Sequence, residues 1–378
     1  MDFTLSKEQL LLQKMARDYA EKFIEPIARQ IDEENKIPQE IIEGLGELEL
    51  FGIPFPEEYG GADAGYDGYT LVMEQISKVS GGVAMTIAAH TLGLGAIRSF
   101  GTEEQKKKYL PAGCKGKEIA SFAFTEPGTG SDPKQLSSIA VKEGDYFILN
   151  GTKRFISNAN YPGPMVIFAK EMESGEVTAF ILEKWTEGYS ISEPWEKVGH
   201  RGGILVDVYM KDIKIPAENL LGKVGQGFPI LLLGIALGKI GTSTAALGAT
   251  LAAYEEGVKY AREKTHRDKP IAKFQAIQLK IADLAIKYET SRWLCYRLGC
   301  LANNIKDPAQ FAREAALTKA YAGDVVVEAA HIAMDVHGSY GLMKDYKVER
   351  ILRDALIGPQ IEGVSDMQRM IIAGAALR

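Results

Sequence analysis

Hydrophobic positions in the first third of the chain recur at helical spacing. Apolar side chains fall at intervals of three or four residues through Ile31, again over 41–51 and again over 69–100. A turn-rich stretch, 54–67, separates the last two segments. This pattern predicts an N-terminal helical domain over residues 1–118.

The pattern changes in the middle of the chain, where short β-branched and aromatic runs replace the helical spacing. These runs occupy 139–141, 146–149, 165–169, 177–182 and 204–210. Turn residues separate them, and the Asn150-Gly151 pair between two runs predicts a β-hairpin. We therefore expect a small antiparallel β-barrel over residues 119–224.

Helical spacing returns in the last part of the chain. The predicted helices are 229–266, 272–305, 309–336 and 364–378. Long apolar-faced helices joined by short loops are typical of a four-helix bundle, expected here over residues 225–378. Small residues such as Gly241 and Gly248 allow neighbouring backbones to approach closely. The predicted fold class is α+β, mainly α.

Composition excludes several classes of function. With 378 residues and 46% hydrophobic content, the chain can bury a large core. Its net charge of −6 argues against nucleic-acid binding, which needs a basic face. The three cysteines and five histidines lack metal-ligand spacing, so no metal site is expected and a reducing compartment fits. The longest apolar run, 228–238, is shorter than the ~20 residues of a membrane span. We expect a cytoplasmic protein without a membrane span.

A glycine-rich turn follows a strand-like run near Phe122. It reads Thr125-Glu126-Pro127-Gly128-Thr129-Gly130-Ser131-Asp132. Glycines let the backbone come close to a ligand, and two hydroxyl side chains add short hydrogen-bonding groups. Successive N–H groups in such a turn can form a concave site for a flavin or a phosphate.

Further segments downstream give this turn a context. They are Lys153-Arg154-Phe155-Ile156-Ser157-Asn158-Ala159, then Phe274-Gln275, then Arg353-Asp354-Ala355, and finally Ile361-Glu362-Gly363-Val364-Ser365-Asp366-Met367-Gln368. Together, in this order, the segments resemble the acyl-CoA dehydrogenase family over essentially the whole chain, in particular its bacterial short-chain, butyryl-CoA type. The family's TEP-x-x-GSD, K-x-W-I-T-N, F-Q and EGTS-x-x-Q motifs all have counterparts. The resemblance implies FAD, an acyl-CoA substrate, a homotetramer or homodimer, and an electron-transferring flavoprotein as partner.

Glu362 is the catalytic base that the resemblance implies. It follows an apolar stretch, and Ser365 or Asp366 is placed to cap the last helix. A base beside a thioester must reach within ~3 Å of the α-proton, and dry surroundings raise its pKa towards the working pH. In the family, the hydride leaves the β-carbon for flavin N5, while the backbone N–H at the Glu362 position and a flavin hydroxyl polarise the thioester oxygen. An ordinary acid near a helix start is the alternative.

Cofactor and substrate contacts are also implied position by position. Residues expected to contact FAD are Phe122, Phe124, Thr125, Gly130, Ser131, Phe155, Ile156, Ser157, Lys264, Arg267, Gln275, Asp335, Gly338, Val364 and Asp366. Residues expected to contact the substrate are Ser131, Lys239 and Gly363. From the residues alone, Phe155 could equally belong to the barrel core and Gln275 to a solvated helix face.

The chain departs from the family pattern around the FAD phosphates. The family's pyrophosphate-binding Arg falls on Lys264, which lacks the bidentate fork of a guanidinium. Our hypothesis is that Arg267 shares or takes over that contact. The family's Gln and Gly-Gly become Asp335 and Gly338-Ser339. An acid near a pyrophosphate is repelled unless a cation lies between them.

The substrate contacts depart as well. The family's Asp-x-x-Arg beside the substrate becomes Ala236-Leu237-Gly238-Lys239. Tyr before the base becomes Ile361, and Thr after it becomes Val364. These changes predict an acyl group that is cyclic, branched or polar rather than a plain fatty acyl chain.

The leading interpretation is FAD-dependent α,β-dehydrogenation of an acyl-CoA, giving a 2-enoyl-CoA by anti elimination. The same residues serve the reverse reaction, reduction of an enoyl-CoA. A flavin-dependent hydroxyacyl-CoA dehydratase or dehydrogenase is another alternative. Because the FAD contacts are altered, a further alternative is that the chain is a non-catalytic scaffold relative of the family. The presence of Glu362 and of the intact glycine-rich turn disfavours this alternative.

Overall fold

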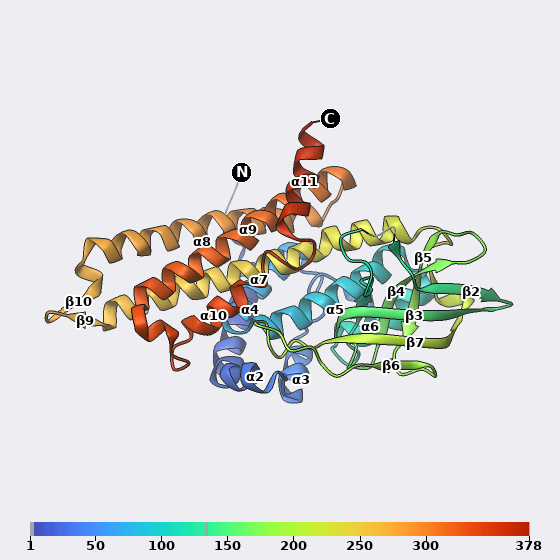
Figure 1. Ribbon diagram of the computed structural model, residues 1–378, viewed down its shortest axis with the longest axis horizontal. Helices are drawn as coiled ribbons and strands as arrows, with labels where there is room; N and C mark the ends of the chain where they lie inside the picture. Colours follow the sequence, from blue (N-terminus) through green and yellow to red (C-terminus); the bar gives the residue numbers. More distant parts are fainter. Residues whose placement is uncertain (1–3, 133–134, 378) are drawn as a thin grey trace.

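The chain folds in the predicted order of helices, strands and helices (Figure 1). The computed structural model describes residues 4–132 and 135–377. Helices occupy most of its length, and the sheet lies at one end, on the right of Figure 1. The mainly helical fold class with a β middle part is therefore confirmed.

The N-terminal part is helical, as predicted. Its elements are α1 (Lys7–Tyr19), a π-helical turn (Ala20–Ile24), a 3-10 turn (Glu25–Ile27), α2 (Ala28–Glu34), α3 (Gln39–Glu47), a 3-10 turn (Glu57–Tyr59), α4 (Gly65–Val79), α5 (Gly81–Phe100) and α6 (Glu103–Cys114). The continuous pattern over 69–100 is divided between α4 and α5. Ser80 separates them because its side chain accepts the N-terminal cap bond of α5 from the N–H of Val83.

All five predicted runs in the middle part are strands. The strands are β1 (Ser121–Ala123), β2 (Ile139–Glu143), β3 (Tyr146–Ser157), β4 (Pro164–Glu171), β5 (Val177–Glu183), β6 (Tyr189–Ile191), β7 (Leu205–Pro216) and β8 (Leu220–Leu221), with a 3-10 turn at Ala217–Asn219. The sheet order is β6-β7-β3-β2-β4-β5-β8, with β1 beside β4. The pairs β1/β4 and β2/β4 are parallel, so the predicted antiparallel sheet is a mixed one. In the described residues no ladder joins β6 to β8.

The prediction of a hairpin at Asn150-Gly151 is wrong. Both residues lie inside β3, at a register shift against β7. The Asn150 side chain exchanges two hydrogen bonds with Asp212 across the ladder, at 2.9 and 3.0 Å. Because the Asn150 side chain bonds to Asp212 of β7, the chain continues as a strand at this position and does not turn. The hairpin is instead at Gly144 (φ 58°), between β2 and β3.

The C-terminal part contains three long helices and two short ones among the described residues. Its elements are α7 (Gly227–Glu263), β9 (Thr265–His266), β10 (Lys269–Pro270), a 3-10 turn (Ile271–Lys273), α8 (Gln275–Ala302), α9 (Pro308–His337), a 3-10 turn (Gly338–Leu342), α10 (Val348–Ala355) and α11 (Ser365–Ala376). The four predicted helices are present. Helix α10 was not predicted, because the segment is only eight residues long and contains many charged residues.

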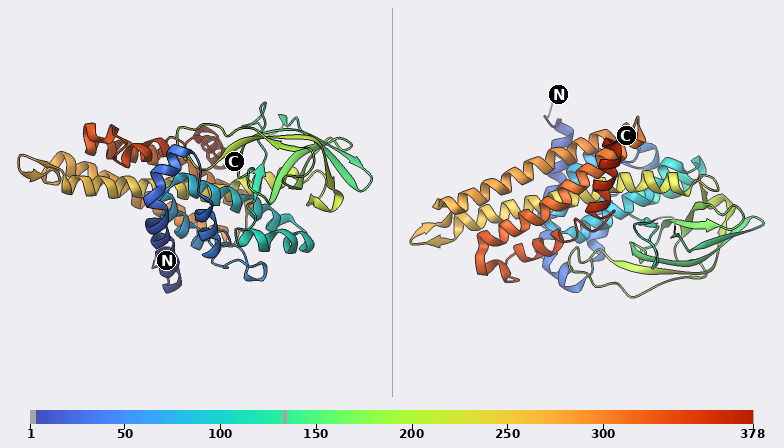
Figure 2. Two further views of the ribbon diagram at one scale, coloured as in Figure 1. Left: turned by 90° about the horizontal axis from the view of Figure 1, so that it is seen from below. Right: turned by 45° about the horizontal axis from the view of Figure 1, so that its top comes forward.

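Helix α7 connects all parts of the molecule. It runs the length of the bundle to the sheet, beside α8 and α9 on one side and α4 and α5 on the other (Figures 1 and 2). By length and composition, α5 and α7 could each cross a membrane. Most of the apolar window is buried inside the protein, 67% in α5 and 72% in α7. Both are therefore core helices in this fold.

Two glycines allow α7 to lie against its neighbours. A Cβ at Gly241 would be 2.9 Å from the Cβ of Ala88 on α5. A Cβ at Gly248 would be 2.5 Å from the carbonyl oxygen of Glu74 and 2.8 Å from the amide nitrogen of Lys78, both on α4. Backbone atoms cannot move aside as a side-chain tip can, so Gly248 sets the distance between α4 and α7.

We expect Gly248→Ala to lower the free energy of unfolding by about 1–3 kcal/mol, because the added methyl group overpacks a rigid contact. The same substitution at Gly374, in α11, meets no atom within 4 Å. There it should raise helix stability by about 0.5–1 kcal/mol. Denaturant unfolding of both variants measures the change in the free energy of unfolding, which should be negative for Gly248→Ala and positive for Gly374→Ala. Equal changes in the two variants would contradict the packing argument.

Candidate active site

Glu362 lies in the loop that connects α10 to α11 and has a left-handed backbone conformation. Its φ is 51°, and Gly363 follows with φ 83°. A left-handed non-glycine residue costs energy and persists only where its surroundings enforce it. Among the described residues, nothing accepts a hydrogen bond from the N–H of Glu362.

The predicted capping of the last helix is wrong. The N-terminal cap of α11 is Val364, without a side-chain hydrogen bond. The hydroxyl of Ser365 instead donates to Asp324 on α9 (2.9 Å), because the first turn of α11 packs against α9. Asp366 is exposed in that first turn.

Two buried side chains hold the Glu362 loop. The Lys319 ammonium, on α9, donates to the carbonyl oxygens of Pro359 (3.1 Å) and Gly363 (2.7 Å). The amide of Gln368 donates to the same Gly363 carbonyl at 2.9 Å. Neither residue was among the predicted site residues. Gln368 lies in the quoted C-terminal motif, whereas Lys319 had no local signal because its partners are some 40 residues away.

The Glu362 carboxylate faces a bare part of α7. A Cβ at Gly238 would be 3.2 Å from Glu362 Oε2 and 3.4 Å from the methyl groups of Leu92 on α5. Burial raises the pKa of Glu362, and the ammonium groups of Lys239 and Lys319 oppose that rise. A carboxylate with a raised pKa in apolar surroundings is suited to accept a proton.

Helix α7 also brings Phe122 to this place. A Cβ at Gly234, one turn before Gly238, would be 3.1 Å from the Phe122 ring and 3.7 Å from Leu92. The half-buried Phe122 and Glu362 therefore lie one helical turn apart along the same face of α7. Residues 240 positions apart in sequence are thus neighbours, as the predicted site requires.

A buried ion pair supports the glycine-rich turn from behind. Lys153 Nζ lies 2.7 Å from Glu126 Oε1, and both side chains are fully buried. The carboxylate also accepts from the N–H groups of Ser137 (2.6 Å) and Ser138 (3.0 Å). Burial alone would raise the pKa of Glu126, but Lys153 and the serine donors outweigh it and lower that pKa to about 2. Both charged residues lie inside the motifs quoted from the sequence, yet neither was assigned a role.

Phe155 lies on the surface of the sheet rather than in its core. The register of β3 against β7 shifts between Lys153 and Ile156, and Phe155 has φ 58°. Its ring is 51% exposed and meets Trp195 edge-on at 5.5 Å. The N–H of Arg154 donates to the carbonyl of Thr125 (2.7 Å), so this bulge lies directly beside the glycine-rich turn.

The other expected contacts near the turn are divided between core and surface. Phe124 and Ile156 are buried in the hydrophobic core, so only their backbone atoms could contact a ligand. Thr125 and Ser157 are half-buried, while Gly130 and Ser131 are exposed.

The remaining expected FAD contacts lie at the other end of the bundle. Lys264 ends α7, with its ammonium 4.4 Å from the centroid of the Tyr340 ring. Arg267 is exposed in the β9–β10 turn, at the far left of Figure 1. Gln275, at the start of α8, is also exposed. Along α7 this end is about 45 Å from Gly234.

Asp335 and Gly338, at the end of α9, belong to the same distant group. The Asp335 carboxylate pairs with Lys280 of α8 at 2.6 Å. The repulsion expected between this acid and a phosphate is therefore reduced by a neighbouring cation. Gly338 has φ 58°, and a Cβ there would meet no atom within 4 Å.

Comparison with known proteins identifies this arrangement. Three family models match in order: "Acyl-CoA dehydrogenase, N-terminal domain" over residues 6–117, "middle domain" over 121–213 and "C-terminal domain" over 225–377. This chain belongs to the acyl-CoA dehydrogenase family. It is an oxidoreductase that acts on CH–CH groups, and its cofactor is FAD.

Several relatives match this acyl-CoA dehydrogenase along its whole length. The short-chain specific acyl-CoA dehydrogenase of Clostridium acetobutylicum is 37% identical and covers 100% of both chains. A subunit of the caffeyl-CoA reductase–Etf complex of Acetobacterium woodii is 37% identical over 99% of each chain. The solved structure of butyryl-CoA dehydrogenase from Megasphaera elsdenii is 35% identical over 100% of both chains, with a TM-score of 0.96.

The turn and the bulge of this dehydrogenase suit a flavin. An ideal Cβ at Gly128 or Gly130 would meet no atom within 4 Å, so the backbone of the turn is open to a ligand. The exposed Phe155 ring supplies an aromatic face beside it. Half-buried hydroxyls at Thr125 and Ser157 supply hydrogen-bonding groups. Within the described residues, no group of three or more His, Cys, Asp or Glu side chains could hold a metal ion.

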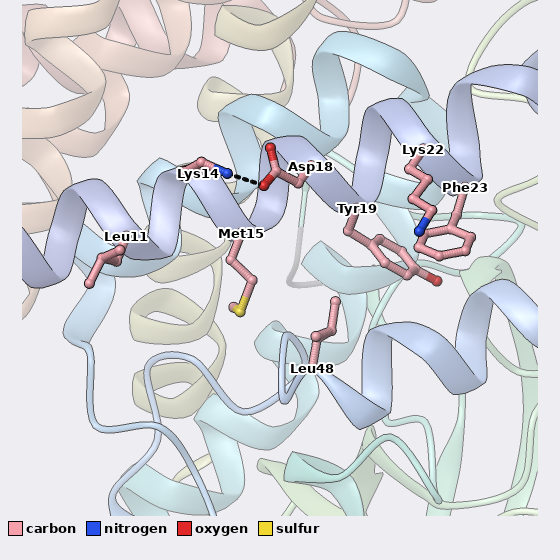
Figure 3. Close-up of a pocket in the computed structure, with 8 residues that line it drawn as sticks. All are labelled: Leu11, Lys14, Met15, Asp18, Tyr19, Lys22, Phe23 and Leu48. Atoms are coloured by element: carbon pink, nitrogen blue, oxygen red, sulfur yellow. Dashed lines mark hydrogen bonds and ion pairs between the residues drawn. The ribbon is translucent and has the colours of Figure 1, made fainter.

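The dehydrogenase also has a surface groove on its N-terminal helices (Figure 3). It has a volume of about 370 Å³ and is lined by Leu11, Lys14, Met15, Asp18, Tyr19, Lys22, Phe23 and Leu48. The Lys14–Asp18 ion pair lies along one side of it. None of the expected cofactor or substrate contacts lines this groove, which is therefore separate from the candidate active site.

We expect Glu126→Gln to lower the free energy of unfolding by about 3–5 kcal/mol, because it leaves Lys153 buried without a carboxylate. The double variant Glu126→Gln/Lys153→Met should recover most of that loss. Asp18→Asn, in the exposed pair with Lys14, is the control and should cost about 1 kcal/mol or less. Urea unfolding measures all three, and a cost at Glu126 as small as the control contradicts an anchoring role.

Proposed function

We propose that this enzyme oxidises an acyl-CoA thioester to a 2-enoyl-CoA, with Glu362 as the base that removes the α-proton. One observation carries the proposal: a carboxylate with a raised pKa, on a left-handed residue, faces the same glycine-lined part of α7 as Phe122. Held at the glycine-rich turn, FAD would supply the acceptor for the hydride that leaves the β-carbon. Loss of the proton to Glu362 and of the hydride leaves the new double bond.

The chain's own groups can perform the proton transfer. Lys319 and Gln368 fix the loop backbone, so the Glu362 carboxylate does not need to reorganise when substrate binds. The N–H of Glu362, which has no acceptor among the described residues, is available to polarise the thioester oxygen. Leu92 and the bare face of α7 supply an apolar surface that keeps water from the carboxylate.

The acyl group that we propose is cyclic, branched or polar. Ala236, Ile361 and Val364 replace the residues expected beside a plain acyl chain, and Lys239 is a buried cation in the same region. We propose an electron-transferring flavoprotein as the redox partner and a soluble, cytoplasmic enzyme. The name of the Acetobacterium relative supports this partner and also favours the reverse reaction, reduction of an enoyl-CoA, as a second candidate.

We further propose that two copies of the chain complete each FAD site, within a homotetramer. Gly234, which packs against Phe122, and the Lys264 end are about 45 Å apart along α7, farther than one FAD molecule extends. If the expected contacts at both places bind FAD, they must come from different copies. The domain limits that we propose, 1–118, 119–224 and 225–378, leave the Lys264 group on the C-terminal domain.

Glu362→Gln should lower the rate of flavin reduction by an acyl-CoA by at least about 10²–10⁴-fold, because the general base is lost while the shape is kept. The measurement is anaerobic bleaching of the flavin with a panel of straight, branched, cyclic and carboxylated CoA thioesters. Glu187→Gln, at an exposed acid, is the control. Reduced enzyme mixed with enoyl-CoA thioesters tests the reverse direction. Undiminished bleaching in Glu362→Gln would falsify the assignment.

Removal of the cation at the distant end should release FAD. If Arg267 shares the pyrophosphate contact, Arg267→Ala and Lys264→Ala should each lower the FAD content of the purified protein. Absorbance after gel filtration measures both the flavin per chain and the size of the assembly. Loss of FAD from Lys264→Ala alone contradicts the role of Arg267, and full FAD in both variants contradicts a shared site.

A further inference from the structure

Lys239 lies next to the residue that the Glu362 carboxylate faces. An ideal Cβ on Gly238 would be 3.2 Å from Glu362 Oε2, and Lys239 is the next residue along α7. Its side chain is only 3% exposed. The Lys239 and Glu362 charges act on each other, so a buried cation lies within electrostatic range of the proposed base.

The Lys239 ammonium differs from the other buried ammonium groups. Four lysines are buried in the described part of the chain. Lys153 pairs with a carboxylate, Lys184 donates to two carbonyl groups and a hydroxyl, and Lys319 donates to two carbonyl groups. The Lys239 ammonium makes no hydrogen bond or ion pair among the described residues, although the backbone carbonyl of Lys239 accepts from Thr242. Burying a charge without such a partner costs folding free energy, which suggests that Lys239 has a functional role.

Few charged groups face Lys239. The charges that act on Lys239 are the Glu362 carboxylate, in the loop before α11, and the Lys319 ammonium, on α9. Asp324, also on α9, is engaged by Ser365 and by Arg369 of α11. One turn earlier on α7, Ala236 carries no charge that could neutralise Lys239.

The two lysines act on Glu362 in different ways. Lys319 holds the backbone of the loop through two carbonyl groups, so its removal would displace Glu362. Lys239 makes no such bond, so its influence on Glu362 is the field of its charge. We propose that Lys239 is a positioning residue that acts on Glu362 through its charge. The dry surroundings of Glu362 favour the neutral acid. The buried Lys239 ammonium keeps Glu362 ionised and therefore able to accept a proton.

The sign of the effect follows from charge alone. Burial favours the neutral carboxyl group, and a nearby cation favours the carboxylate. Burial also lowers the pKa of Lys239, to about 8, with Glu362 opposing that change. Below that pH the ammonium is charged, which covers the range in which a carboxyl group titrates. Loss of the Lys239 charge therefore raises the pKa of Glu362.

The test titrates Glu362 directly in the FAD-containing enzyme. Infrared difference spectra follow the protonated carboxyl band against pH, with Glu362→Gln subtracted to identify the band. Lys239→Met and Lys239→Gln should each move the midpoint upward by about one pH unit or more, the range for loss of a nearby charge. Lys239→Arg keeps the charge and should leave the midpoint within half a unit. Thermal unfolding checks that each variant is folded.

The result separates this inference from the proposed function on which it rests. An unmoved midpoint in a folded Lys239→Met or Lys239→Gln enzyme overturns the role of Lys239, whatever Glu362 does. A shift of equal size in Lys239→Arg also overturns it, because packing rather than charge would then be responsible. If Glu362→Gln still reduces its flavin with acyl-CoA, the base assignment fails even where the midpoint shifts as expected.

Discussion

Two hydrogen bonds from one buried ammonium group hold the candidate active site in place. Lys319 donates to the carbonyl oxygens of Pro359 and Gly363, on either side of Glu362. Together with the Gln368 amide, these bonds hold a left-handed glutamate against a helix, a conformation that is unfavourable in a free chain. Lys319, which holds the loop, lies on α9, whereas the surface that the Glu362 carboxylate faces lies on α7. The position of the carboxylate therefore depends on how these two helices pack. On α7, Gly238 leaves room for the carboxylate, since a Cβ there would be 3.2 Å from Glu362 Oε2.

Buried polar groups recur where separate elements must keep one arrangement. The Lys184 ammonium, after β5, donates to the carbonyl of Asn158, while the Asn158 amide donates to the carbonyl of Thr86 on α5. The N–H of Ala120 donates to His90, also on α5. The Asn158 and Ala120 bonds join the middle part to helix α5, and each bond would be costly to leave unmade. The Glu126–Lys153 pair does the same inside the sheet, behind the turn that faces the proposed flavin site.

The length of α7 has a consequence for the cofactor. It places the Phe122 contact at Gly234 and the Lys264 end about 45 Å apart. If both groups bind FAD, as we propose, association of two chains is needed for a complete site, and cofactor binding is coupled to assembly. The Lys280–Asp335 pair shows how the distant end tolerates an acid, since a cation already accompanies it.

Sequence alone determined the order of helices and strands, because apolar spacing reflects which face of each element is buried. It also identified Glu362 and the glycine-rich turn as candidates, because these lie in contiguous motifs. It failed at Asn150-Gly151 and at the cap of α11, where side chains bond to partners far away in the chain, Asp212 and Asp324. Only the tertiary structure decided that Phe122 and Glu362 lie one turn apart along α7, that Lys319 holds the Glu362 loop and that the Lys239 ammonium is buried without a hydrogen bond among the described residues. These features depend on how separate helices pack against one another. The spacing of residues along the chain does not show which helices will be in contact, so the sequence could not predict them.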